Sequence, residues 1–148
     1  MSPVAATREL TDLAGRARLV VMRLARRIRQ EGMGDEATPS MISALASIDR
    51  FGPLTLGELA AVEQVQPPTM TKIVARLEAA GYVVREVDAG DRRVARVQVT
   101  SAGHRFVERG RQRGAMFLAE RLRTLSAEER AAVEAALPVL ERLLDGDA

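Results

Sequence analysis

Amide, hydroxyl and basic side chains are concentrated between residues 66 and 76 of this 148-residue chain. Gln66, Thr69, Thr71, Lys72 and Arg76 are of types that hydrogen bond phosphate oxygens or the edges of bases. Thr69, Lys72 and Arg76 are spaced at i, i+3 and i+7, so on a helix they share one face. This spacing indicates a surface that contacts nucleic acid, although an ordinary solvated helix face has a similar composition.

A second basic group lies between residues 91 and 96. Arg92 and Arg93 directly follow Asp91, and Arg96 comes three positions later. A guanidinium fits a narrow minor groove, where the negative potential of DNA is strongest. Because a carboxylate repels phosphate, we expect Asp91 to accept a hydrogen bond from Arg93 and to hold the loop in shape. The alternative is a turn that is merely soluble.

The distribution of charge supports the same interpretation. The chain has 22 basic and 20 acidic residues, for a net charge of +2. Residues 64–113 nevertheless hold ten basic and five acidic residues, so the positive charge is concentrated there. A surface that faces an anionic polymer has this pattern, and so does a solvated charged face.

Composition excludes several classes of protein. The chain has no cysteine and one histidine, His104, so it has no disulfide framework, thiolate zinc site or cysteine peroxide sensor. With a single imidazole and only scattered carboxylates, we expect no enzyme, no metal and no cofactor. Aromatic residues make up 3%, which argues against a stacking platform for single strands. No apolar run is long enough to span a membrane and residues 1–10 lack a secretory pattern, so we expect a cytoplasmic protein.

The two basic groups fall on a predicted helix pair and a hairpin. Thr55 and Glu58 form a capping box that starts a helix ending near Gln64. Pro67 and Pro68 can open a second helix, because prolines are tolerated in the first turn. Valine-rich strands are predicted at 82–87 and 94–99, with Val83 and Val97 facing inward, joined by the turn-forming loop 88–93.

Longer helices flank this central part. Apolar residues recur at three- and four-residue spacing over residues 7–30, and Thr38-Pro39 starts a helix that Gly52-Pro53 stops. Thr100 is the predicted N-cap of a helix over 101–124, and Ser126 begins a last helix in which Pro138 introduces a bend. The predicted fold is mainly α with a small β-hairpin wing (α+β). Because the hairpin follows a helix–turn–helix, the arrangement is a winged helix.

The wing and the residues after it resemble the MarR family of transcriptional regulators. Asp91-x-Arg93, Val97, Val99-Thr100 and Gly103 match its pattern D-x-R-x-x-x-V-x-L-T-x-x-G, with valine in place of leucine at position 99. The stretch from Leu56 to Glu78 is similar to the helix–turn–helix of the family. The resemblance covers essentially the whole chain.

The resemblance implies one domain over residues 1–148, a DNA-binding lobe at 37–99 and dimerisation helices at 7–30 and 101–145. It also implies that Arg93 enters the minor groove, held by Asp91, and that four residues of the second helix contact DNA: Thr69, Thr71, Lys72 and Arg76. Pro68 departs from the family, which often has serine there. It removes a backbone donor, so we expect no phosphate anchor at that position.

The family is dimeric, and apolar residues at both ends of this chain agree with a homodimer: Leu10, Leu13, Val139, Leu140, Leu143 and Leu144. The alternative is that the terminal helices bury these residues against each other within one chain. Relatives also bind small aromatic or anionic effectors. Candidate pocket residues are Met22, Met41, Leu45 and Phe106, with Arg16 for an anion, although residues of these types are more often plain core or surface. We expect His104 to be structural.

Taken together, the sequence predicts a sequence-specific regulator that binds double-stranded DNA at a pseudo-palindromic operator. We expect a homodimeric repressor that a small effector releases from DNA. A winged-helix module for protein–protein contacts, without DNA binding, is the alternative. Acidic or apolar residues at positions 72, 76 and 93 would favour that module, and they are absent.

Overall fold

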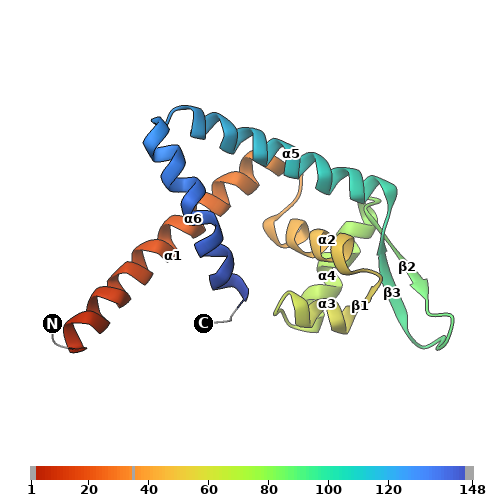
Figure 1. The fold of residues 1–148 in the computed structure, drawn as a ribbon. Coiled ribbons are helices and arrows are strands. Elements are labelled where there is room, and N and C mark those ends of the chain that lie inside the picture. Colours follow the sequence, from red (N-terminus) through yellow and green to blue (C-terminus); the bar gives the residue numbers. More distant parts are fainter. Residues whose placement is uncertain (1–2, 35, 146–148) are drawn as a thin grey trace.

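Helices dominate the chain, with three short strands near its middle (Figure 1). The computed structural model describes residues 3–34 and 36–145. The elements in these ranges are α1 (Pro3–Met33), α2 (Pro39–Phe51), β1 (Leu54–Thr55), α3 (Leu56–Val62), α4 (Pro67–Ala79), β2 (Val83–Val87), β3 (Ala95–Val99), α5 (Ser101–Arg123) and α6 (Ala127–Asp145). The predicted mainly α fold with a small wing is confirmed.

Side-chain caps define where the helices begin. The Thr38 hydroxyl accepts a hydrogen bond from the Met41 amide at 3.4 Å. At α3, Thr55 and Glu58 form the predicted capping box, with reciprocal bonds of 3.1 and 2.8 Å. The hydroxyl of Thr100 accepts from the Gly103 amide at 3.0 Å. These caps satisfy backbone donors that have no helical partner, so the local sequence fixes these helix starts.

The sheet contains a strand that the sequence analysis missed. The strand order is β1–β3–β2, with both pairings antiparallel. The missed strand β1 pairs Leu54 with Val97 and Thr55 with Arg96. Two residues are too few to show an alternating pattern, so only the tertiary pairing reveals this strand. The wing is therefore a hairpin whose second strand is also attached to the start of α3.

The hydrophobic core lies in the lobe formed by α2, α3, α4, the sheet and the first half of α5. Val83 and Val97 are buried, as predicted for the inward positions of the hairpin. The largest fully buried side chains are Leu45, Ile48, Leu59, Met70, Val74, Leu77, Val83, Val97 and Val107. This core holds α4 and the wing in a fixed relation to each other.

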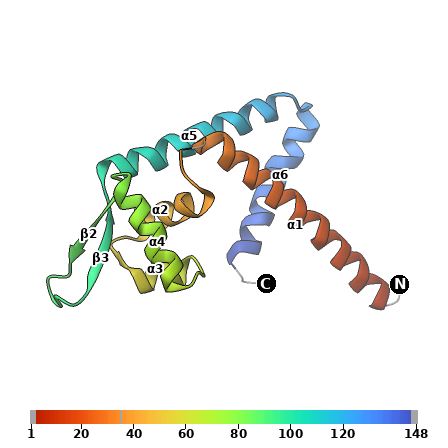
Figure 2. The ribbon, with the colours of Figure 1, turned by 180° about the vertical axis from the view of Figure 1, so that it is seen from behind.

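The long helices α1 and α5 cross where both carry glycine. A Cβ added to Gly32 would lie 2.6 Å from the carbonyl oxygen of Gly110, and one added to Gly114 would lie 2.9 Å from Ile28 Cγ2. The backbones therefore approach closely at this point. From the crossing, the N-terminal part of α1 extends away from the lobe (Figure 2).

The terminal helices do not bury each other's apolar residues. Leu10 and Leu13 on α1 are 67% and 61% exposed, and Leu143 and Leu144 on α6 are 70% and 86% exposed. Within the described ranges, α6 packs extensively against no other element. The alternative of burial within one chain is therefore wrong. No described helix has the length and apolar character needed to cross a membrane.

Candidate nucleic-acid interface

Helices α3 and α4 form the helix–turn–helix. The turn between them includes Gln64, whose φ of 53° places it in the left-handed region. Gln66 is the N-cap of α4, but its side chain makes no capping hydrogen bond and is exposed. Both α3 and α4 contribute buried residues to the core, including Leu59 and Met70. The first turn of α4 is thus presented outward by a rigid support.

Helix α4 has one buried and one exposed face. Its apolar residues enter the core, whereas Thr69, Thr71, Lys72 and Arg76 are exposed. Neither Lys72 nor Arg76 has an ion-pair partner among residues 3–34 and 36–145. The Thr71 hydroxyl donates to the Pro67 carbonyl at 3.0 Å, which leaves it only as an acceptor for other groups. The exposed face thus offers two uncompensated positive charges.

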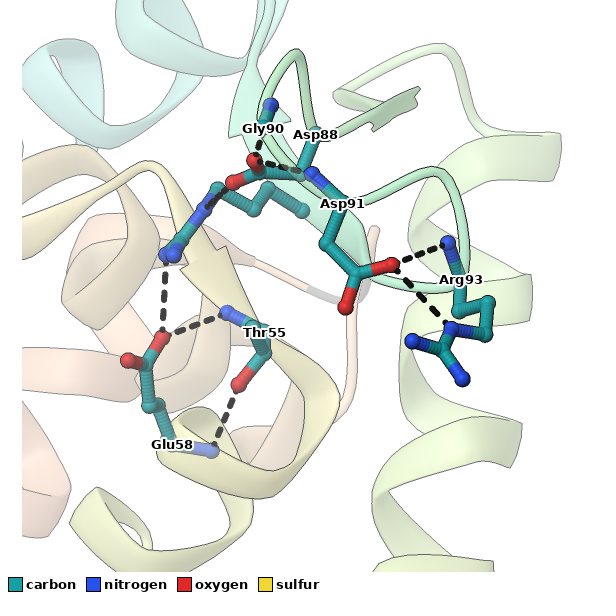
Figure 3. Close-up of polar contacts among 7 residues, drawn as sticks. Thr55, Glu58, Asp88, Gly90, Asp91 and Arg93 are labelled. Carbon is teal, nitrogen blue, oxygen red and sulfur yellow. Dashed lines mark hydrogen bonds and ion pairs between the residues drawn. The ribbon is translucent and has the colours of Figure 1, made fainter.

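At the tip of the wing, Asp91 holds Arg93 as the sequence predicted (Figure 3). Asp91 Oδ1 accepts from the Arg93 amide at 3.0 Å and from Arg93 Nε at 3.4 Å. The Arg93 side chain is still 92% exposed, so most of its guanidinium is open to solvent. Arg92 beside it is also exposed. The tip is therefore shaped by a carboxylate and carries two accessible guanidinium groups.

Asp88 is a second organising carboxylate, and the sequence analysis did not single it out. Its Oδ1 accepts from the amides of Gly90 and Asp91 at 2.8 and 3.2 Å, which closes the turn. Its Oδ2 accepts from Arg96 Nε at 2.6 Å. The pattern Asp88-x-Gly90 is typical of a turn in which aspartate bonds the backbone two residues on, and this signal could have identified it.

Arg96 lies at the base of the wing, and its guanidinium is engaged within the chain. Besides Asp88, it donates from Nη1 to Glu58 Oε2 at 3.4 Å, the same oxygen that caps Thr55 (Figure 3). We call Thr55, Glu58, Asp88 and Arg96 the wing-base network. The spacing of the wing arginines predicts that Arg96 contacts DNA with those at the tip, whereas the structure pairs Arg96 with two carboxylates.

Both carboxylates of the wing-base network favour the charged form. The Arg96 hydrogen bond is the main cause of a lowered pKa at Asp88, and the bond from the Thr55 amide is the main cause of a lowered pKa at Glu58. The bond to Asp88 also raises the pKa of Arg96. Because both pKa values are lowered, ionisation of these carboxyl groups stabilises the folded state at pH values above the ordinary carboxyl pKa. This stabilisation is lost as the pH falls through the lowered pKa values. The network is therefore fully charged at neutral pH.

His104 connects α5 to α2. Its Nδ1 lies 2.6 Å from Asp49 Oδ1, and Arg111 Nη1 lies 3.6 Å from Asp49 Oδ2. The Asp49 side chain is only 6% exposed, so it is held between the two helices. These contacts agree with the structural role expected for His104. In the described part of the chain, no group of three His, Cys, Asp or Glu residues could hold a metal ion.

The five residues predicted to line an effector pocket do not come together. Met41, Leu45 and Phe106 are buried in the core, where Phe106 stacks on Tyr82 with ring centroids 4.6 Å apart. Arg16 and Met22 are exposed on α1. A hollow of about 520 Å³ instead lies between the end of α1 and the start of α2, and of the five only Met41 lines it. The sequence does not predict its basic residues, Arg26 and Arg29. Helical periodicity does not show that the end of α1 lies beside the start of α2.

Comparison with known proteins agrees with this geometry. The sequence pattern of the MarR family matches residues 37–95. An HTH-type transcriptional regulator of Mycobacterium leprae is 36% identical over 133 residues, which cover 90% of this chain and 93% of that protein. A Pseudomonas aeruginosa structure described as a transcriptional regulator superposes with a TM-score of 0.82 at 33% identity, covering 92% of this chain and 96% of that one.

A further solved structure shares the fold at lower identity. A MepR variant of Staphylococcus aureus, bound to an oligodeoxyribonucleotide, has a TM-score of 0.69 at 22% identity and covers 89% of this chain and 97% of its own. The relatives are named as transcriptional regulators and not as enzymes. With the helix–turn–helix, the wing and a relative matched over nine-tenths of the chain, the chain belongs to the MarR family of winged helix–turn–helix transcriptional regulators.

Proposed function

We propose that the chain binds double-stranded DNA in a sequence-specific manner, with α4 in the major groove and the wing tip in the adjacent minor groove. The observation that carries this proposal is the exposed face of α4, where Lys72 and Arg76 have no ion-pair partner among the residues that the structure describes. Thr69, Thr71 and Gln66 add hydrogen-bonding groups to the same end of the helix. Arg92 and Arg93 supply the minor-groove cations. A protein–protein module would not need these uncompensated charges.

The operator that fits this protein is a pseudo-palindrome read by a homodimer in the cytoplasm. Many leucines are exposed on both α1 and α6, and monomers rarely leave large apolar surfaces open to water. A second copy can cover them with its own α1 and α6. Two-fold symmetry then presents two α4 helices to half-sites about 10 base pairs apart. The MepR variant of similar fold, whose structure contains an oligodeoxyribonucleotide, supports this proposal.

Lys72→Ala and Arg76→Ala are expected to weaken operator binding. If the side chain bonds a base, each change costs about 1 to 3 kcal/mol of binding free energy, concentrated at one operator position. If it bonds phosphate, the loss is independent of sequence and the salt dependence becomes shallower. Fluorescence anisotropy with operator variants at two salt concentrations separates the two cases. Unchanged binding by both variants would show that α4 does not enter the groove.

Arg93→Ala should weaken binding mainly on operators with A·T-rich flanks, because the wing arginine reads groove width. Asp91→Ala should have a weaker effect of the same sign, since it removes the hydrogen bonds that hold Arg93. Simple Coulomb repulsion predicts the opposite sign for Asp91→Ala, because a negative charge near phosphate disappears. Titration of both variants against one operator decides between them, and tighter binding by Asp91→Ala would reject the holding role.

We further propose that the protein is a repressor released from DNA by a small aromatic or anionic effector. The hollow between α1 and α2 supports this proposal, because its lining combines Arg26 and Arg29, together with Glu36, with the apolar residues Met41 and Ile42. A planar carboxylate suits this combination of a cationic wall and an apolar floor. Titrating the DNA complex with benzoate should release DNA from the wild-type protein and release less from Arg29→Ala. DNA that stays bound at saturating benzoate would argue against this class of effector.

A further inference from the structure

Arg96 joins three parts of the DNA-binding lobe through one side chain. It projects from β3 at the position paired with Thr55 of β1. Its Nε reaches Asp88 in the wing loop at 2.6 Å, and its Nη1 reaches Glu58 in the first turn of α3 at 3.4 Å. The two carboxylates that accept these bonds, from Asp88 and Glu58, are labelled in Figure 3. The contact therefore connects the wing to the first helix of the helix–turn–helix.

The partners of Arg96 are themselves fixed by backbone hydrogen bonds. Asp88 is held by the amides of Gly90 and Asp91, and Glu58 is held by the amide of Thr55. A planar guanidinium that meets two preoriented carboxylates loses little additional freedom on binding. The strands of the wing are also attached to α3 by the two-residue pairing of β1 with β3, and Val83 and Val97 anchor them in the core. Because Asp88 follows β2, the wing-base network adds a polar link at the loop end of the wing, beyond these attachments.

We propose that Arg96 is a positioning residue for DNA recognition. It fixes the wing loop 88–93 relative to α3, so that Arg93 meets the minor groove while α4 occupies the major groove. This inference rests on the proposed function. It assigns Arg96 no direct bond to DNA, because its Nε and Nη1 both donate to carboxylates of the chain.

Asp88→Asn separates positioning from direct contact. Asparagine keeps the acceptor oxygen that bonds Gly90 and Asp91, so the turn is retained. It replaces the oxygen facing Arg96 by an amide donor, which breaks the link. If Arg96 bonded phosphate directly, freeing it from Asp88 would strengthen DNA binding or leave it unchanged. If Arg96 positions the wing, Asp88→Asn must weaken binding as Arg96→Gln does.

The experiment measures operator affinity of the full-length protein for Arg96→Gln, Asp88→Asn and the control Arg85→Gln. Arg85 pairs with Glu78 at 2.9 Å between β2 and α4, so the control also removes an ion pair from the lobe. We expect Arg96→Gln and Asp88→Asn to weaken binding by about tenfold each in the dimer, where each change acts twice, and Arg85→Gln by much less. Thermal unfolding establishes that each variant is folded, and Arg96→Lys replaces Arg96→Gln if the latter is not.

The decisive measurement is the operator affinity of the double variant that combines Arg96→Gln with Arg93→Ala. Because Arg96 acts through Arg93, Arg96→Gln should cause no further loss in the Arg93→Ala background, and its effect should be greatest on A·T-rich flanks. The proposal is overturned if Asp88→Asn binds as tightly as the wild type or more tightly, if Arg96→Gln is without effect, or if its loss persists without Arg93. Failure of the wild-type protein to bind any operator would instead reject the proposed function.

Discussion

Leu140→Glu is expected to separate the dimer into monomers and to reduce operator affinity by about 10² to 10⁴. Leu140 lies on the exposed apolar side of α6 with Val133, Leu137 and Leu144. A carboxylate there must be buried without a partner when a second copy covers the helix, which costs more than the contact contributes. A monomer also loses the gain in affinity that comes from linking two half-site contacts. Sedimentation velocity and anisotropy on the same samples measure the two effects together.

The matched control is Ala131→Glu in the same helix. Ala131 is exposed on the side of α6 opposite Leu140 and glutamate is a good helix former, so this variant adds the same charge away from Leu140. It should remain dimeric and bind DNA with nearly unchanged affinity. If Leu140→Glu behaves in the same way as this control, α6 does not contribute to the dimer interface.

Gly103→Ala should lower the free energy of unfolding by about 3 kcal/mol. An added Cβ would collide with the carbonyl oxygen of Tyr82 and would lie 2.9 Å from Val99 Cγ2. The Tyr82 carbonyl cannot easily move, because it accepts a hydrogen bond from the Thr100 amide at 2.9 Å. Relief of the clash would thus require the start of α5 to separate from β2 and β3. Urea unfolding monitored by circular dichroism measures the loss.

Gly57→Ala is the corresponding control. Gly57 lies in the first turn of α3, and the nearest atom to an added Cβ is Thr55 Oγ1 at 4.0 Å. Alanine there meets open space and reduces the freedom of the unfolded chain, so we expect a gain of about 0.5 to 1 kcal/mol. Equal stability of Gly103→Ala and the wild-type protein would contradict the close packing of α5 on the sheet. Gly103, the last residue of the family pattern, is thus explained by the lack of room for a side chain beside the Tyr82 carbonyl.

Local sequence determined most element boundaries. The Thr55 and Glu58 capping box starts α3, Thr100 starts α5, and Gly52-Pro53 ends α2, as predicted. Each of these signals depends on hydrogen bonds or backbone restrictions within a few residues, which a sequence displays directly. The bond from Arg93 to Asp91 belongs to the same class, because the two residues are only two positions apart. Helical spacing in turn separated the exposed face of α4 from its buried one.

Contacts between distant segments were decided by the tertiary structure alone. Arg96 meets Glu58 across 38 positions, β1 is recognised only by its pairing with β3, and the hollow beside Met41 depends on how α1 approaches α2. For this reason, sequence spacing places Arg96 with the arginines of the wing tip. It also does not identify Arg26 and Arg29 as residues that line the hollow. Hydrogen bonds and burial between distant residues depend on how whole elements pack, and neither spacing nor composition records that packing.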